Sequence, residues 1–216
     1  MKLAIYCAGG LGKEVYDLAV RNNENRWKEI FFVDDMRQEK IFYGVRIAKF
    51  EQLKESGDVE FVIANGEPFV RQILRERVIK AGFRLTRIID KTATISHSAR
   101  IADGVIIQAG CFVSSDVAIG ENTYLQQINT IGHDCIIGPN CVISSLCQVS
   151  GNCVIGDNVY IGVGSSVREK VSVGQGSIIG MGSFVHKDVG ELSVAYGNPA
   201  KIIRTNESKR VFQGGI

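Results

Sequence analysis

The chain has 216 residues, of which 45% are hydrophobic and 22% charged, and its formal net charge is +2. These values are typical of a globular protein with one large or two small domains, and they give no electrostatic reason to expect nucleic acid or an anionic membrane as a partner. One short apolar run, Leu3 to Ala8, precedes a Gly-rich, charged stretch. This run is too short for a secretory signal or a membrane span, so we expect a cytoplasmic protein.

Apolar runs alternate with helical patterns over the first part of the chain. The patterns predict strands at 3–7, 30–33 and 61–64, and helices at 13–21 and 68–81. Strands that alternate with helices indicate a small parallel sheet with crossovers. Residues 1–85 are therefore predicted to form a Rossmann-like α/β half-domain.

A glycine-rich loop, with Gly9, Gly10 and Gly12, follows the first predicted strand. Such a loop lets backbone N–H groups approach an anion at a helix N-terminus. The loop departs from a dinucleotide fingerprint, because Cys7 occupies the place of the first glycine and the domain is only half of a dinucleotide fold. Asp34 and Asp35 end the second strand, where they could accept hydrogen bonds from a ribose or a base. A mononucleotide or nucleotide sugar fits better than NAD, and a glycine turn without a ligand is the alternative.

A period of six residues fills the middle of the chain. From Ile89 to Val185, all 17 positions spaced by six are Ile, Leu or Val. This spacing predicts a hexapeptide β-solenoid over residues 86–190, in which three hexads close one triangular coil and residues 18 apart stack at about 4.8 Å. The repeated aliphatic residue should point inward, and the next position is often glycine, where a corner without a Cβ is useful.

Five of the six cysteines share one phase of this repeat. They lie four residues after the inward aliphatic position, so we expect them to line the interior of the solenoid: Cys111, Cys135, Cys141, Cys147 and Cys153. Buried free cysteine commonly acts as a small hydrophobe. Packing therefore explains their spacing better than a metal site or disulfides.

Histidine is the natural proton acceptor near neutral pH, and the chain has three: His97, His133 and His186. The phase of the repeat places His133 outward near a corner, next to Asp134, which could orient it. Direct attack of a substrate amine or hydroxyl on an acyl donor, with His133 as general base, needs no enzyme nucleophile. An inert surface histidine is the alternative. His97 lies two coils earlier on the same face, about 9.6 Å away, so one zinc ion could not bridge the pair within a chain.

After Gly190 the repeat stops. Residues 191–216 are expected to form a turn at Tyr196 to Lys201 and a polar tail that is helical in part.

Several segments together resemble the hexapeptide-repeat acyltransferases, and specifically the NeuD/PglD-like nucleotide-sugar and sialic-acid acetyltransferases. The resemblance rests on the loop from Ala8 to Val15, Asp34-Asp35, Gly66 with Arg71, Ile131 to Gly138, Val149 to Gly151, and Gly197 to Lys201. It implies a left-handed parallel β-helix and a homotrimer, with acyl-CoA in the groove between neighbouring helices. It also implies that the N-terminal domain holds the nucleotide of the sugar.

The resemblance implies a role for each matching residue. His133 would be the general base and Asp134 its acidic neighbour. The nucleotide sugar would contact Gly9, Gly10, Gly12, Asp34, Asp35, Gly66 and Arg71, and the acyl-CoA would contact Val142, Gly151, Gly164 and Gly182. No metal is implied. The chain departs from the family at Val142, where a second histidine is common, at Ser144 to Leu146, where the family is usually rich in Pro and Gly, and at Cys7. A different acyl group is therefore an open alternative to acetyl.

The leading hypothesis is acyl transfer from acetyl-CoA to the amino group of a UDP- or dTDP-linked deoxysugar. Sugar O-acetylation, as in the sialic-acid enzymes, is the first alternative. A zinc hydro-lyase of the β-helix carbonic-anhydrase type shares the two histidines 36 apart but would need a third histidine where Gly138 stands. A non-catalytic trimeric scaffold is the remaining alternative.

Overall fold

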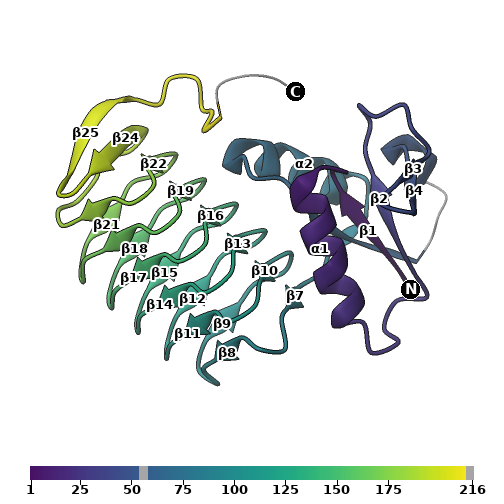
Figure 1. Ribbon diagram of the computed structural model, residues 1–216, viewed down its shortest axis with the longest axis horizontal. Helices are drawn as coiled ribbons and strands as arrows, with labels where there is room; N and C mark the ends of the chain where they lie inside the picture. Colours follow the sequence, from purple (N-terminus) through teal and green to yellow (C-terminus); the bar gives the residue numbers. More distant parts are fainter. Residues whose placement is uncertain (54–57, 213–216) are drawn as a thin grey trace.

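The computed structural model describes residues 1–53 and 58–212 and consists of an α/β domain packed against a three-sided β-helix (Figure 1). The predicted N-terminal elements are confirmed. They are β1 (Lys2–Tyr6), α1 (Gly10–Arg21), β2 (Glu29–Val33), β5 (Val59–Ile63) and α2 (Pro68–Lys80). The short elements β3 (Ile41–Phe42), β4 (Val45–Ala48), the 3-10 turn η1 (Phe50–Leu53) and β6 (Arg84–Leu85) complete the domain.

The sheet of this domain has the order β3-β4-β2-β1-β5-β6. Strand β1 is central and pairs in parallel with β2 on one side and β5 on the other. The carboxyl ends of these three strands therefore meet at one edge of the sheet, which is where a doubly wound fold binds its ligand.

The hexads form a β-helix of the left-handed class of hexapeptide transferases, as expected. Face 1 consists of β7 (Ile88–Ile89), β10 (Ile106–Ile107), β13 (Tyr124–Leu125), β16 (Val142–Ile143), β19 (Tyr160–Ile161) and β22 (Ile178–Ile179). Face 2 consists of β8 (Thr94–Ile95), β11 (Phe112–Val113), β14 (Thr130–Ile131), β17 (Gln148–Val149), β20 (Ser166–Val167) and β23 (Phe184–Val185). Face 3 consists of β9 (Arg100–Ile101), β12 (Ala118–Ile119), β15 (Ile136–Ile137), β18 (Val154–Ile155) and β21 (Ser172–Val173).

The repeated aliphatic residues and the five predicted cysteines pack in one interior cluster, which confirms their expected orientation. Each of these cysteines is at most 1% exposed. The Cys135 Sγ donates to the Ser150 carbonyl at 3.0 Å, and the Cys153 Sγ donates to the Arg168 carbonyl at 3.0 Å. Packing and these weak hydrogen bonds account for the thiols.

The glycines that follow the inward aliphatic residue are needed because they lack a Cβ, as expected, and the structure gives the physical reason. The left-handed residue of most hexads is the third after the inward aliphatic, as at Asp134 with φ +58°. The glycines directly after the aliphatic have no such φ, but a Cβ there would meet the next coil. At Gly132 it would lie 2.6 Å from the Gly151 nitrogen. Close stacking of the coils excludes a side chain at this position.

The outer surface of face 1 is apolar, and the α/β domain covers it. Ile106, Tyr124 and Val142 point away from the solenoid and are at most 1% exposed. They share one hydrophobic cluster with Leu3 of β1 and Val15 of α1, among others. The two domains are therefore joined by a common core, which fixes the position of the α/β domain on the solenoid.

The C-terminal part forms a hairpin, so the expectation of a partly helical tail is wrong for the described residues. Strands β24 (Ser193–Gly197) and β25 (Ala200–Thr205) are antiparallel, and β24 extends face 1 by pairing with β22. The open edge of the last coil offers backbone partners that a helix could not use. None of the helices in residues 1–53 and 58–212 is long and apolar enough to cross a membrane.

Candidate active site

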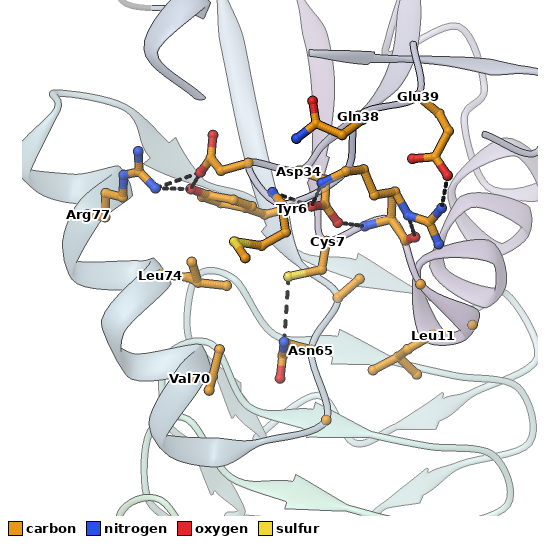
Figure 2. Close-up of a pocket in the computed structure, with 18 residues that line it drawn as sticks. Tyr6, Cys7, Leu11, Asp34, Gln38, Glu39, Asn65, Val70, Leu74 and Arg77 are labelled. Carbon is orange, nitrogen blue, oxygen red and sulfur yellow. Dashed lines mark hydrogen bonds and ion pairs between the residues drawn. The ribbon is translucent and has the colours of Figure 1, made fainter. Parts of the chain in front are cut away.

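A pocket of about 810 Å³ opens at the carboxyl edge of the N-terminal sheet, between the starts of α1 and α2 (Figure 2). Its wall combines the loop after β1, the acidic loop after β2 and one side of α2. The lining residues are Tyr6, Cys7, Ala8, Gly9, Gly10, Leu11, Asp34, Asp35, Met36, Arg37, Gln38, Glu39, Ala64, Asn65, Gly66, Val70, Leu74 and Arg77. The volume is in the range of small-molecule sites.

The N-terminus of α1 forms part of this wall without a side-chain cap. Gly9 is the N-cap residue, and the first turn holds no acidic residue. A Cβ at Gly9 or Gly10 would meet nothing within 4 Å, so both glycines leave open space over the helix end. Uncapped N–H groups and the positive end of the helix dipole favour an anion such as a phosphate.

Two residues hold the helix close to the strand that precedes it. A Cβ at Gly12 would lie 2.5 Å from the Cys7 carbonyl oxygen, so only glycine allows this approach. Cys7 itself has φ +83°, the conformation expected of the glycine that it replaces. Its thiol accepts a hydrogen bond from the Asn65 side chain at 3.6 Å, and burial raises its pKa to about 11. The thiol is therefore protonated at neutral pH.

The Asp34 carboxylate organises the acidic loop around the pocket. Its Oδ2 accepts from the Ala8 amide at 2.9 Å, and its Oδ1 accepts from the amides of Met36 and Arg37 at 2.9 and 3.1 Å. A carboxylate has about four acceptor positions, so one remains for a ligand. Asp34 thus ties the loop after β2 to the loop after β1.

Asp35 belongs to a hydrogen-bonded cluster with Tyr6 and Arg77, which Figure 2 labels at one end of the pocket. Its Oδ2 accepts from the Tyr6 hydroxyl at 2.7 Å and from Arg77 at 2.6 Å, and its Oδ1 accepts from the Phe50 amide at 2.9 Å. Burial opposes ionisation, but the Tyr6 and Phe50 hydrogen bonds and the Arg77 charge outweigh it and lower the pKa of Asp35. Burial and the Asp35 carboxylate raise the pKa of Tyr6. At neutral pH the Asp35 carboxylate is therefore ionised, whereas the Tyr6 hydroxyl keeps its proton and donates it in the hydrogen bond to Asp35.

The structure brings together Gly9, Gly10, Asp34, Asp35 and Gly66 in the pocket wall. Gly12 is the third residue of α1 and acts through close packing. Several lining residues were not expected from the sequence, among them Tyr6, Asn65, Val70, Leu74 and Arg77. The last three lie at positions i, i+4 and i+7 of the predicted second helix, which places them on one face and could have revealed them.

Arg71 lies elsewhere than the resemblance implied. It is 0% exposed, does not line the pocket and donates hydrogen bonds to backbone carbonyls of the chain. Its Nε donates to the Asn122 carbonyl at 2.8 Å, and its Nη1 donates to the carbonyls of Ile63 and Asn65 at 2.5 and 3.1 Å. Burial lowers the pKa of Arg71 to about 10, which still leaves a cation at neutral pH. Its guanidinium joins the α/β domain to the solenoid and does not face the pocket.

The second part of the site is an exposed edge of the solenoid, between faces 2 and 3. His133 lies on this edge, and its Nδ1 is 2.7 Å from the Asp134 Oδ2. The two side chains are 59% and 53% exposed. Gly151 stacks directly beyond the imidazole, since a Cβ there would lie 2.7 Å from the His133 Nε2. The absence of a Cβ at Gly151 therefore provides the space that the His133 imidazole occupies. The Nδ1 of this imidazole contacts the Asp134 carboxylate.

The other residues implied for acyl-CoA are spread over the solenoid. Val142 is 1% exposed beneath the α/β domain, so it is closed to a ligand in this chain. Gly164 and Gly182 lie in register on the edge between faces 1 and 2, with φ of +68° and +66° and open space around a built Cβ. No group of three or more His, Cys, Asp or Glu that could hold a metal ion occurs in residues 1–53 and 58–212.

The pocket and His133 lie on opposite sides of the same chain. The α/β domain covers face 1 and reaches the edge between faces 3 and 1, where Arg71 contacts Asn122. His133 lies on the edge between faces 2 and 3, which is the edge opposite face 1 in a three-sided prism. A ligand held in the pocket cannot contact the imidazole of its own chain.

An α/β pocket built around a helix N-terminus, joined to a hexapeptide β-helix with an exposed His-Asp pair, defines a hexapeptide-repeat transferase. Residues 2–78 match the PglD N-terminal domain, and residues 152–187 match the bacterial transferase hexapeptide repeats. No curated protein sequence matched the chain.

Three solved structures align over almost the whole chain. The acetyltransferase domain of PglB from Neisseria gonorrhoeae FA1090, in complex with acetyl coenzyme A, is 31% identical over 94% of this chain and 98% of that chain, with a TM-score of 0.88. A mutant of perosamine N-acetyltransferase from Caulobacter crescentus, in complex with CoA and GDP-perosamine, is 27% identical over 94% and 97%, with a TM-score of 0.89. WeeI from Acinetobacter baumannii AYE is 26% identical over 94% and 100%, with a TM-score of 0.89. The chain belongs to this PglD-like family of hexapeptide-repeat sugar acetyltransferases, as its resemblance indicated.

Proposed function

We propose that this chain transfers an acetyl or related acyl group from acyl-CoA to the amino group of a nucleotide-linked deoxysugar. The observation that carries the proposal is the pairing of an anion-favouring pocket at the start of α1 with an exposed His133–Asp134 pair on the solenoid. The related structures that contain CoA with GDP-perosamine, or acetyl coenzyme A, support the two substrate classes.

His133 is the proposed general base. Asp134 engages Nδ1, which leaves Nε2 as the nitrogen that accepts a proton. The sugar amine attacks the thioester carbonyl, the new C–N bond forms as the C–S bond breaks, and the amine proton passes to Nε2. The coenzyme A thiolate leaves, so no covalent enzyme intermediate is needed.

The nucleotide sugar is proposed to lie across the carboxyl edge of the N-terminal sheet. Its phosphates would meet the α1 N-terminus at Gly9 and Gly10, and its ribose or base would lie toward Asp34 and Asp35, with UDP- and dTDP-sugars as the first candidates. The bound GDP-sugar of the Caulobacter relative adds GDP to the nucleotides that require testing. The proposed acyl-CoA contacts that remain open in this chain are Gly151, Gly164 and Gly182.

A homotrimer is proposed because one chain separates the pocket from His133 across the prism. Large apolar side chains are exposed on face 3, where Ile136 and Val154 are 54% and 45% exposed, and on the edge between faces 1 and 2, where Ile128 and Leu146 are 59% and 55% exposed. Exposed apolar surface of this kind favours association. A neighbouring chain would bring its own His133 to the pocket. The cytoplasm is the proposed location.

The experiment that tests the function is a thiol-release assay with acetyl-CoA against a panel of UDP-, dTDP- and GDP-linked amino sugars, with sialic acid included to detect O-acylation. His133→Gln should lower kcat about 10²- to 10⁴-fold with little change in KM, because only proton removal is lost. His97→Gln is the matched control, since His97 has the same phase two coils earlier but is followed by Ser98. Equal turnover by wild type and His133→Gln would refute the general-base role.

A further inference from the structure

The last described segment, residues 206–212, runs from the end of the solenoid back to the α/β domain (Figure 1). It is anchored at Asn206, which is 2% exposed. The Asn206 amide donates to the Leu192 carbonyl at 2.6 Å, and its side chain donates to the Gly176 carbonyl at 2.9 Å. This anchor lies by the edge between faces 3 and 1, the edge that the α/β domain also reaches.

The other end of the segment is held by Glu67, the N-cap residue of α2. This side chain makes no hydrogen bond to its own helix, although the residue is only 7% exposed. Its two carboxylate oxygens instead accept from the amides of Val211 and Phe212 at 2.8 and 2.7 Å. Burying a carboxylate is unfavourable unless it is hydrogen-bonded. Because the amides of Val211 and Phe212 supply these hydrogen bonds to Glu67, they stabilise the docked position of the segment.

Glu67 also connects the segment to the pocket wall. Its amide donates to the Asn65 side chain at 2.9 Å, and that side chain donates to the Cys7 thiol. Asn65, Gly66 and Cys7 all line the pocket. The docked segment is therefore connected to Asn65 of the pocket wall by two successive hydrogen bonds through Glu67.

The Phe212 ring lies between Gly66 of the pocket wall and Tyr160 of the solenoid. It packs edge-on against Tyr160 of β19, with ring centroids 5.7 Å apart and an interplanar angle of 81°. One ring carbon lies 3.6 Å from the position of a Cβ at Gly66. The residue remains 57% exposed, so much of the ring is available to a ligand that leaves the pocket past Gly66.

The order of the sheet gives the direction in which a nucleotide sugar would cross the pocket. Strand β1 lies between β2 and β5. With the nucleoside at the acidic loop after β2 and the phosphates at the loop after β1, the sugar extends to the loop after β5, which contains Asn65 and Gly66. The Phe212 ring lies beside Gly66 of this loop.

We propose that Phe212 is a substrate-binding residue that packs against the apolar C–H face of the sugar, and that Glu67 positions it. This inference rests on the proposed function, because it assumes a nucleotide-linked deoxysugar. A deoxysugar offers a methyl group and ring C–H bonds, and an aromatic face beside Gly66 matches them. The free nucleoside diphosphate ends before Gly66 and does not reach the ring.

The test compares two ligands in the full-length chain: the nucleotide-linked amino sugar that wild type acylates fastest, and the matching free nucleoside diphosphate. Phe212→Ala should raise the KM for the nucleotide sugar and its calorimetric Kd about five-fold, with the Kd of the free diphosphate and the KM for acetyl-CoA unchanged. Phe212→Tyr should restore wild-type values. Glu67→Gln should give part of the same loss. Tyr43→Ala removes another exposed aromatic ring, on the far side of α1, and serves as the control.

Equal affinities of wild type and Phe212→Ala for the nucleotide sugar overturn the inference and leave the proposed function intact. A parallel loss of affinity for the sugar nucleotide and the free diphosphate also overturns it, because the ring then acts on the whole pocket. If wild type binds none of the nucleotide sugars or diphosphates, the proposed function fails, and the inference fails with it.

Discussion

At the scale of single residues, the position of the His133 imidazole depends on the absence of a Cβ at Gly151. The Nδ1 contact with Asp134 at 2.7 Å fixes the imidazole in one orientation. The ring occupies the space that a Cβ at Gly151 would enter, at 2.7 Å from Nε2 and 2.8 Å from Cε1. A general base must be held within a fraction of an ångström of its productive position.

Gly151→Ala should therefore displace the imidazole. The coil should stay folded, because the atoms nearest to the new Cβ all belong to the His133 side chain, which can rotate away, and none of them is a backbone atom. We expect kcat to fall about 10²-fold with thermal stability almost unchanged. Gly190→Ala is a suitable control, since a Cβ there would approach nothing closer than the Ser193 Oγ at 3.7 Å. Full activity of Gly151→Ala would mean that the observed position of the ring is not the catalytic one.

The Asp35 cluster predicts how stability depends on pH. The pKa of Asp35 is lowered in the folded chain, so the folded state favours the ionised carboxylate. This contribution is complete above the unfolded pKa, about 3.9, and is lost as the pH falls through the lower folded pKa. Asp35→Asn should therefore destabilise the chain at neutral pH and make its melting temperature less dependent on pH below about 4. Parallel melting curves of the two proteins over that range would contradict this linkage.

Residue roles could be predicted from the sequence where the repeat fixes the direction of a side chain. The hexad phase places His133 outward and Cys135 inward, and both expectations agree with their exposure. Arg71 and Val142 could not be placed in this way. Their surroundings depend on how the α/β domain lies on face 1, and that contact joins residues far apart in the sequence.

At the scale of elements, the turn from β1 to α1 combines two kinds of glycine. Gly12 allows the helix to approach the strand, because its Cβ would lie 2.5 Å from the Cys7 carbonyl oxygen. Gly10 has no neighbour within 4 Å of a built Cβ and leaves space at the helix N-terminus. Gly12 is therefore required for packing, whereas Gly10 is required only to leave space for a ligand in the pocket.

Two substitutions should separate these roles. Gly12→Ala should lower the free energy of unfolding by about 2 kcal/mol, because the helix must move away from the strand. Gly10→Asp should leave stability equal or slightly higher, since an acidic side chain suits the first turn of a helix, but it should abolish binding of nucleoside diphosphates by charge repulsion. Chemical denaturation and calorimetry measure the two effects. Nucleotide binding by Gly10→Asp equal to wild type would exclude the α1 N-terminus as the phosphate site.

Secondary-structure elements could be predicted where the sequence carries a local pattern, and could not where pairing with a distant strand decides. The parallel strands of the first domain and the hexads carry their signals in local periodicity, and the structure contains them. The hairpin of β24 and β25 carries no such signal. Strand β24 forms by pairing with β22, a partner available only after the last coils are in place. Local polarity suggested a partly helical tail instead.

At the scale of the whole molecule, the position of the α/β domain determines where chemistry can occur. Its core merges with the outer surface of face 1, and Arg71 fastens it to Asn122. The pocket is thereby held on the side opposite His133. If the proposed trimer sets the His133 edge of one chain against the α/β domain of the next, each complete site would combine a pocket from one chain with an imidazole from its neighbour.

This arrangement predicts that two inactive variants restore activity when they share a trimer. His133→Ala keeps the pocket and lacks the base, whereas Gly10→Asp keeps the base and has a blocked pocket. In trimers that assemble at random from equal amounts, about one quarter of the sites would pair an intact pocket with an intact neighbouring base. Co-expression should therefore recover about a quarter of wild-type turnover, while a mixture of the separately assembled proteins remains inactive. If the site lay within one chain, neither sample would recover activity, because every chain would carry one of the two lesions.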